Sequence, residues 1–267
     1  MNWDLYYQVI SIVGGRYLLI ASIAFLLFYV ILYKSIGYKK IQPKKPHNTD
    51  LLREVVYSLI TISFAGFIVV MLHHPSIAPY TTRYRNISDY GWFYYFAIFP
   101  VFFIMHDTYF YFMHRLMHHP RIFRWFHLVH HKSTNPSPWA AYAFHPLEAL
   151  VEQFITVIFY FTLPIHITHL GIFFLLSIVY NVYGHLGYEL YPSGFSKTKI
   201  GKWINTSTSH NQHHQYFKGN YGLYFLFWDR MLGTIREDYD ARFEEVKTRV
   251  VPEGEIIPAP AFAEQGL

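Results

Sequence analysis

The sequence contains no cysteine, so disulfide bonds, thiolate metal ligands and thiol nucleophiles are all excluded. Charged residues are also scarce, at 15% of the 267 residues, whereas a soluble domain usually carries about 25%. The net charge of +5 comes from basic residues scattered over short loops, so we expect no nucleic-acid partner. These shortages argue against a soluble protein and favour a membrane protein.

The sequence is rich instead in hydrophobic residues, at 52%, and in aromatic residues, at 21%. Aromatic rings are typical of segments that meet the membrane interface. Three apolar stretches approach the ~20 residues that a helix needs to cross ~30 Å of hydrocarbon, and two more flank Pro164 as a helical hairpin whose first stretch is short for a full span. The five stretches are residues 17–33, 55–72, 91–105 (continuing toward 113), 150–163 and 167–183. We predict an all-α polytopic fold with about four transmembrane helices.

One integral membrane domain is expected over residues 1–267. It divides into N-terminal transmembrane helices over 1–90, a catalytic region over 91–240 and a tail over 241–267, which is expected to be loosely ordered from Val251. We expect no signal peptide, because the N-terminus lacks a basic start and a small-residue cleavage site.

Lysines predict the orientation in the membrane. Five of them lie between residues 34 and 45, which places the loop after the first span in the cytoplasm. Alternation of the spans then brings every dense histidine cluster to the cytoplasmic face, as a histidine-rich helical cap. Five histidines outside these clusters are expected to be ordinary loop or interfacial residues, namely His47, His73, His74, His166 and His169.

Three clusters hold eight of the seventeen histidines. They are His114 with His118, His127 with His130 and His131, and His210 with His213 and His214. On a helix, residues at i and i+4 share a face, so each pair at that spacing can reach a common point, with the i+3 residue at the border. Eight imidazoles exceed the four ligands of a tetrahedral zinc, and they suit two neighbouring metal ions. Polar groups near a bilayer are costly, so such clusters mark a functional site.

Residues 95–235 resemble the sterol desaturase and fatty acid hydroxylase superfamily, and are most similar to its sterol C-5 desaturase branch. The resemblance rests on the three clusters in their order, and on His106-Asp107, Phe144-His145-Pro146-Leu147-Glu148, Asn220-Tyr221-Gly222 and Trp228-Asp229-Arg230. It implies a non-haem di-iron centre that uses dioxygen and two external electrons to attack an unactivated C–H bond of a sterol or fatty-acyl lipid. Hydroxylation and desaturation both remain open.

The resemblance also implies site residues beyond the eight. His185, which ends the last apolar stretch, is expected as a ninth metal ligand. Related hydroxylases carry a second histidine where this chain has Glu189, and a carboxylate there can bind iron or orient an imidazole. Residues expected to support the ligands, or to join them, are His106, Asp107, His145 and Glu189. His119 points about 100° away from His118 on a helix and is not expected to be a ligand.

Electrons must come from an external donor, because the chain shows no dinucleotide fingerprint, flavin site or iron–sulfur motif. We expect a small cytochrome or a ferredoxin with its reductase. Exposed basic residues on the cytoplasmic side offer a docking surface, although positive-inside bias explains most of them. These residues are Arg121, Arg124, Lys132, Lys197, Lys199 and Lys202.

Other classes of protein fit less well. A membrane metalloprotease would need His-Glu-x-x-His, which is absent, and a bis-histidine haem protein would place its ligands deep within two spans. A non-catalytic metal-binding protein that binds or transports lipid is the alternative that stays open. Zinc binds imidazole more tightly than ferrous iron does, so a purified sample can carry zinc in place of iron. The endoplasmic reticulum and the bacterial inner membrane are both compatible locations.

Overall fold

A computed structural model describes residues 1–250, and this part of the chain is mostly helical. Its one sheet consists of two short strands, β1 (Arg83–Tyr84) and β2 (Ile165–His166), which pair in parallel. The all-α prediction is confirmed. Residues 251–267, which make up most of the predicted tail, lie outside the described residues. The tail was predicted to begin at residue 241, but residues 241–248 belong to the last helix, α11 (Tyr239–Thr248).

Within residues 1–250, three helices are long and apolar enough to cross a membrane. The first is α1 (Trp3–Phe25), which continues as a π-helix over Leu26–Ile31. The others are α3 (Asn48–Leu72) and α4 (Gly91–Met117). The predicted hairpin is formed by α7 (Pro146–Thr162) and α8 (His169–Gly184), of 17 and 16 residues. Both are short for a full span, so the structure shows three helices of spanning length where about four were predicted.

The first helix begins earlier than the apolar pattern suggested. The pattern predicted a span from residue 17, but α1 begins at Trp3, where the Asn2 side chain accepts the Leu5 N–H at 3.0 Å. An Asn at this position satisfies one of the free N–H groups of the first turn. Arg16, which was expected to bound the span, therefore lies inside the helix.

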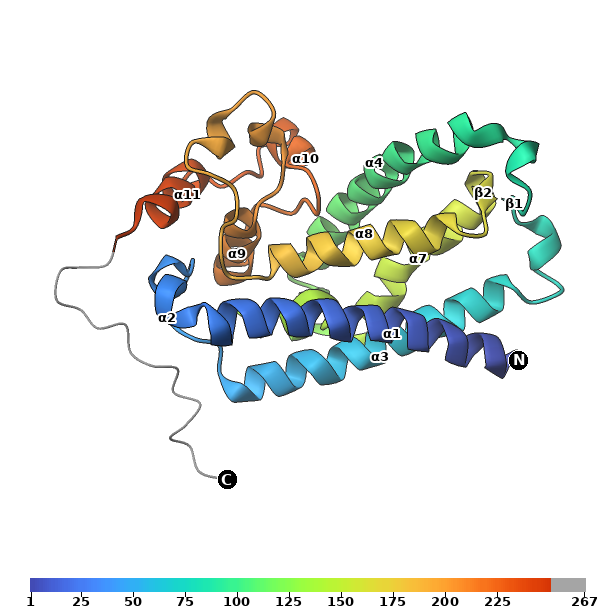
Figure 1. Ribbon diagram of the computed structural model, residues 1–267, viewed down its shortest axis with the longest axis horizontal. Coiled ribbons are helices and arrows are strands. Elements are labelled where there is room, and N and C mark those ends of the chain that lie inside the picture. Colours follow the sequence, from blue (N-terminus) through green and yellow to red (C-terminus); the bar gives the residue numbers. More distant parts are fainter. Residues whose placement is uncertain (251–267) are drawn as a thin grey trace.

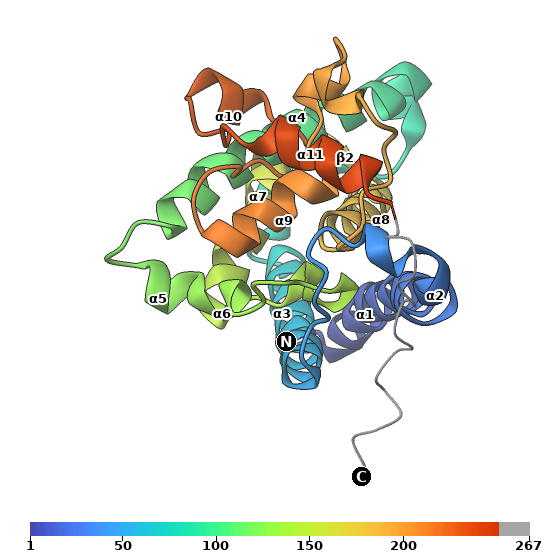
Figure 2. The ribbon, with the colours of Figure 1, turned by 90° about the vertical axis from the view of Figure 1, so that its left-hand side faces the viewer.

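The five long helices run roughly along the long axis of the molecule, and short helices gather at one end (Figure 1). Figure 2 looks onto this end, with α9, α10 and α11 above α5 and α6. The short helices are α2 (Tyr33–Ile36), α5 (Phe123–Phe126), α6 (Leu128–His131), α9 (Ser207–Tyr216) and α10 (Phe227–Met231). Short 3-10 turns lie at Gly37–Lys39, Ala78–Tyr80, Ile87–Asp89, Pro138–Tyr142, Phe195–Lys197 and Gly201–Trp203.

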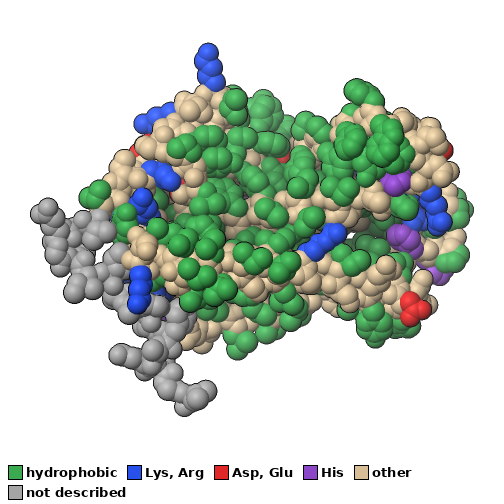
Figure 3. Space-filling model, in the orientation of Figure 1, with side chains coloured by type: hydrophobic (Ala, Val, Ile, Leu, Met, Phe, Trp, Pro, Cys, Tyr) green, Lys and Arg blue, Asp and Glu red, His purple; other side chains and the backbone are tan. Residues whose placement is uncertain are grey.

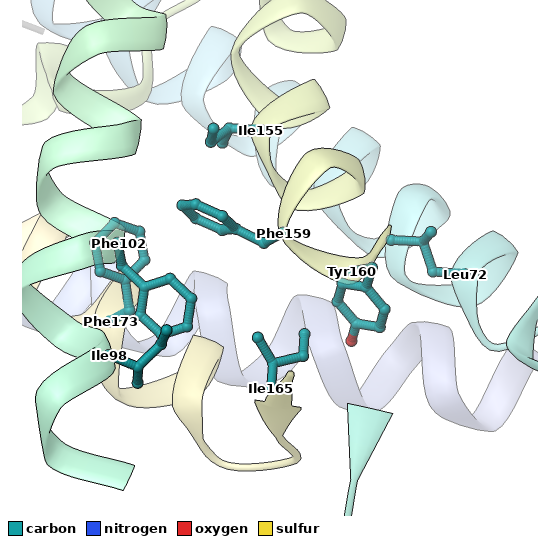
Figure 4. Close-up of a cluster of buried hydrophobic side chains, with 8 residues drawn as sticks. All are labelled: Leu72, Ile98, Phe102, Ile155, Phe159, Tyr160, Ile165 and Phe173. Carbon is teal, nitrogen blue, oxygen red and sulfur yellow. The ribbon is translucent and has the colours of Figure 1, made fainter. Parts of the chain in front are cut away.

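An aromatic core holds the long helices together at the other end. Phe102 of α4 packs against Phe159 of α7 at 4.9 Å and against Phe173 of α8 at 5.5 Å between ring centroids (Figure 4). Buried aromatic pairs of this kind add stability beyond the apolar area that they bury. Hydrophobic side chains also cover the outer surface over α1 (Figure 3), where Leu19 is 61% exposed. Such a surface suits a lipid environment.

Two histidines near the strands are structural. The His169 ring accepts the His166 N–H at 2.9 Å through Nδ1 and lies 3.1 Å from the Tyr95 carbonyl through Nε2. The His166 ring contacts the Thr168 hydroxyl and the Arg85 carbonyl, both at 2.8 Å. Both residues were expected to be ordinary loop or interfacial histidines. They are instead buried, and each ring nitrogen has a partner.

Candidate metal centre

Nine buried or half-buried histidines form two groups at the end of the molecule that carries the short helices. We name the first group site A, formed by His114, His118, His127, His131 and His213. We name the second site B, formed by His130, His185, His210 and His214. Within each site, one nitrogen from each ring lies within 4.8 Å of all the others. The nine residues are those that the sequence analysis named as ligands.

Helix ends position these side chains. His114 lies in the last turn of α4, His118 follows that helix, and His185 follows α8. In the second cluster, His127 lies between α5 and α6, and His130 and His131 lie on α6. The third cluster lies on α9. The Thr206 side chain begins α9 by accepting the Ser209 N–H at 3.2 Å. Residues 207–214 of this helix are all buried, so α9 presents its histidines inside the protein.

Each of the last two clusters contributes to both sites. The spacing predicted a common point for each i, i+4 pair, with the i+3 residue at the border, and the structure does bring each pair into one site. The i+3 residues lie in the opposite site: His130 in site B and His213 in site A. Adjacent residues on a helix point about 100° apart, so neighbouring histidines face different centres. Because each of these clusters supplies histidines to both sites, sites A and B form one structural unit.

Oxygen acceptors hold five of the rings in one orientation. In each case the Nδ1 atom lies 2.5–3.0 Å from an oxygen. A carbonyl or carboxylate oxygen can only accept, so Nδ1 carries the proton and Nε2 turns its lone pair to the site. The pairs are His114 with the Tyr221 carbonyl, His127 with Glu148 Oε1, His185 with the Asn181 carbonyl, His213 with the Gly219 carbonyl and His214 with the Ser133 carbonyl.

The distances between ring nitrogens fit bound metal ions. In site B, the Nε2 atoms of His185, His210 and His214 lie 3.0–3.2 Å apart. Because Nδ1 carries the proton in His185 and His214, neither Nε2 can donate to the other, and two lone pairs this close repel. A metal ion with bonds of about 2.0–2.1 Å to nitrogen separates neighbouring ligands by about 2.9–3.4 Å. In site A, the Nε2 atom of His213 lies 3.0 Å from that of His131 and 3.1 Å from that of His118.

Burial keeps these rings neutral, which is the form that binds metals. Desolvation lowers the pKa of His130, His131 and His214 well below the usual value, and the neighbouring histidines add to the effect. The pKa of His185 falls to about 4, again mainly through desolvation. The Nε2 atoms of His114 and His127 are buried and have no hydrogen-bond partner within residues 1–250. Unpaired buried nitrogens facing a common point are typical of a ligand site.

The supporting residues predicted from the sequence lie outside both sites. Glu189 accepts the Thr208 N–H at 3.0 Å and the Tyr183 hydroxyl at 2.6 Å, so it anchors the start of α9. Asp107 accepts three consecutive backbone N–H groups, of residues 223–225, at 2.7–3.2 Å. The structure thus shows Asp107 as an anchor for the segment after α9.

His106 and His145, which were predicted to support the ligands or to join them, have other partners. The His106 Nδ1 atom lies 3.0 Å from the Tyr224 hydroxyl, inside the helical bundle. His145 begins α7, where its Nδ1 atom accepts the Leu147 N–H at 3.3 Å. His119 is exposed, and neither site includes it.

A left-handed turn after α9 supplies two of the carbonyl partners. The sequence did not predict this turn. Phe217, Gly219 and Asn220 all have positive φ, at 62°, 81° and 55°. A Cβ atom on Gly219 would lie 2.7 Å from the Thr234 carbonyl oxygen, so only glycine fits there. The turn directs the Gly219 carbonyl to His213 and the Tyr221 carbonyl to His114. The Asn-Tyr-Gly motif lies at this turn, but it did not predict that the turn supplies carbonyl partners to the histidines.

Glu148 is a further functional residue without a predicted role, although its motif was noted. It lies in the first turn of α7, is 1% exposed and contacts His127 at 2.5 Å. A carboxylate that holds the outer nitrogen of a ligating histidine raises the basicity of that ligand. The sequence signal was a carboxylate three residues after His145, at the start of a helix.

An apolar helical bundle with two buried histidine sites at one end defines a class of membrane protein equipped to hold metal ions. Sequence comparison gives the particular family. The fatty acid hydroxylase family matches residues 99–234. The chain belongs to this family.

Similarity to individual proteins places the chain in the sterol desaturase branch. It is 30% identical to the Delta(7)-sterol 5(6)-desaturase ERG3B of Gibberella zeae, over 87% of this chain and 71% of that protein. It is 28% identical to the Delta(7)-sterol 5(6)-desaturase erg3C of Aspergillus fumigatus, over 88% and 79%. It is also 28% identical to the lathosterol oxidase of Mus musculus, over 83% and 72%. No solved structure matches the chain. The protein is an oxidoreductase that acts on membrane lipids.

Proposed function

We propose that the protein uses dioxygen to oxidise an unactivated C–H bond of a sterol, with one iron ion in site A and one in site B. The observation that carries this proposal is the set of nine histidines whose nitrogens converge on two neighbouring points. When bound, the two ions would supply the redox chemistry that activates dioxygen. Desaturation consumes one O2, two electrons and two protons, removes two hydrogen atoms from the lipid and releases two waters. Hydroxylation leaves one oxygen on the lipid and releases one water.

The protein's own residues would hold and shield the centre. The four carbonyls and Glu148 keep the protons on Nδ1, so that the ring nitrogens facing the sites stay free to bind a metal. Phe144 packs on His130 at 5.0 Å and Phe217 packs on His131 at 4.8 Å. These rings would keep bulk water from the reacting atoms.

A sterol is the proposed substrate because the similar proteins are named as Delta(7)-sterol 5(6)-desaturases and a lathosterol oxidase. Introduction of a double bond at the 5(6) position of a sterol is therefore the first reaction to test. A fatty-acyl lipid is the second substrate class.

We infer that the histidine sites face the cytoplasm. Lys34 and Lys39 lie directly after the π-helical end of α1, and positive-inside bias favours a cytoplasmic position for them. The external electron donor, a small cytochrome or a ferredoxin with its reductase, would dock at the same end. Exposed basic side chains there include Arg121, Arg124, Lys132, Lys199 and Lys202.

The test is a comparison of lipids from host cells that express the wild-type protein or a His131→Ala, His210→Ala double variant. The host should make a 7-unsaturated sterol. With the wild type we expect a product two mass units lighter, or a product that carries ¹⁸O when cells grow under ¹⁸O2. An identical lipid profile in both strains, with both proteins folded and the wild type loaded with metal, would exclude the proposed activity on these lipids.

A further inference from the structure

A second binding site is suggested by a cavity of about 320 Å³ in the half of the molecule away from sites A and B. It lies between α1, α3, α7 and α8, and its volume is within the range of ligand pockets, about 300–1,000 Å³. Ile62, Ala65 and Phe174 contribute to its apolar wall. In the space-filling view the surface is hollowed between α1 and α8, towards the N-terminal end of α1 (Figure 3).

Two buried hydroxyls line this cavity without a protein partner. Thr61 of α3 is 1% exposed and Thr156 of α7 is 3% exposed. Neither Oγ1 atom makes a hydrogen bond with any of residues 1–250. Buried hydroxyls in proteins are nearly always hydrogen-bonded, so these two call for a ligand with a polar atom.

A positive charge lines the same cavity. Arg16 lies inside the candidate span Trp3–Ile31, and its Nη1 atom donates to the Gly171 carbonyl at 2.7 Å. The guanidinium has five N–H groups and is always charged. No ion pair of the described residues involves Arg16, and no Asp or Glu lines the cavity. A charged side chain within a membrane span usually serves a function, because its burial is costly.

We propose that this cavity binds the carboxylate of a long-chain fatty acid. Arg16 would pair with the carboxylate, and the hydroxyls of Thr61 and Thr156 would donate to its oxygens. The acyl chain would lie against the apolar wall and enter sideways from the bilayer, where Gln8 and Ile12 are exposed on α1. The donors around the cavity and its net positive charge favour an anionic head over the neutral hydroxyl of a sterol.

None of the nine histidines of sites A and B lines the cavity. Thr156 follows Glu148, the residue that contacts His127, by eight positions on α7, which is about 12 Å of helix rise. A fatty acid bound there would occupy a site of its own. The proposal therefore goes beyond the proposed function and does not depend on it.

The experiment uses photolabelling of the purified full chain in lipid nanodiscs. A palmitate analogue that carries a diazirine serves as the probe, and mass spectrometry locates the labelled peptides. The variants are Arg16→Gln, Arg16→Lys and a Thr61→Val, Thr156→Val double variant. Thr162→Val is the matched control, because this exposed threonine of α7 bonds only to its own helix, at the Ile158 carbonyl.

We expect labelling of peptides from α1, α3 and α7 in the wild type. It should fall about tenfold in Arg16→Gln and in the double threonine variant, and stay near the wild-type level in Arg16→Lys and Thr162→Val. Metal content should match the wild type in every variant, which shows that the protein is folded. Equal labelling in the wild type and Arg16→Gln would overturn the proposal. Labelling of the same peptides by a photoreactive cholesterol analogue, and not by the palmitate probe, would overturn it too.

A further variant separates this proposal from the proposed function. Palmitate labelling should persist in the His131→Ala, His210→Ala double variant, because that variant alters only sites A and B. Loss of labelling there, with the protein still folded, would mean that the cavity is not an independent site.

Discussion

Buried histidines occur at both ends of this molecule, and the two ends use them differently. At the strand end, every ring nitrogen of His166 and His169 has a hydrogen-bond partner within the described residues. At the other end, oxygen acceptors or neighbouring rings fix the orientation of the nine histidine rings. The remaining ring nitrogens face one another. The rings are buried to a similar degree, so burial alone does not distinguish structure from function. What distinguishes them is whether each nitrogen already has a partner.

The largest effect should follow from breaking both sites at once. The His131→Ala, His210→Ala double variant removes one ligand from site A and one from site B. We expect lipid oxidation to fall at least about a thousandfold, to background, because a lost ligand alters the geometry of each centre. His119→Ala is the matched control, since this ring is exposed and lies outside both sites, and it should keep full activity. Substantial activity in the double variant would contradict the assignment of the sites.

We expect acid to release the metal ions from sites A and B. The ordinary pKa of histidine is about 6.5, and burial lowers the pKa of His185 to about 4. Between these values the unfolded, metal-free chain takes up protons that the folded site resists. The stability of the site is therefore complete above pH 6.5 and declines as the pH falls towards 4. Metal content after dialysis across this range measures the effect, and a metal content that stays unchanged from pH 7 down to pH 4 would contradict it.

A smaller effect is expected from Glu148→Gln. The substitution keeps the volume and one oxygen acceptor but removes the negative charge beside His127. Metal affinity of site A should fall about 10–100-fold, measured by competition with a chelator. Glu152→Gln is the control, one turn further along α7 and not a member of either site. Equal losses in the two variants would show that a general effect of α7, and not the contact with His127, sets the affinity.

The smallest effect on the metal centre is expected at the strand end. His169→Ala removes a fully buried ring together with its hydrogen bonds to residues 95 and 166. The free energy of unfolding should fall by about 2 kcal/mol, with a melting temperature lower by about 5 °C. Metal content should not change. A variant that melts like the wild type but loses metal would reverse the roles of the two ends.

The sequence predicted which histidines come together better than it predicted their grouping. The i, i+4 spacing and the family resemblance identified all nine histidines that the structure brings together. The spacing could not show that His130 and His213 serve the opposite site, because that depends on how α6 and α9 face each other. The carbonyl partners could not be predicted either, because every residue carries the same carbonyl group. Only the fold brings the carbonyls of Tyr221 and Gly219 to the histidine rings.

The limits of the spans were predicted less well. Hydrophobicity placed the start of the first span at residue 17, although the helix begins at Trp3. A charged residue normally ends an apolar stretch, but Arg16 finds the Gly171 carbonyl of α8 and stays within the helix. The hairpin was correctly placed on both sides of Pro164, and its first helix was expected to be short. Only the packing of α8 against α1 explains the position of Arg16. This packing cannot be predicted from the local sequence.

The most direct test of the two-site account is the metal content of the purified protein, measured by elemental analysis beside His127→Ala and His214→Ala variants. These residues belong to site A and site B, respectively. The account predicts about two metal ions per chain in the wild type. Each single variant should keep about one ion, because each disrupts one site. One ion or none in the wild type, with no change in either variant, would contradict the account.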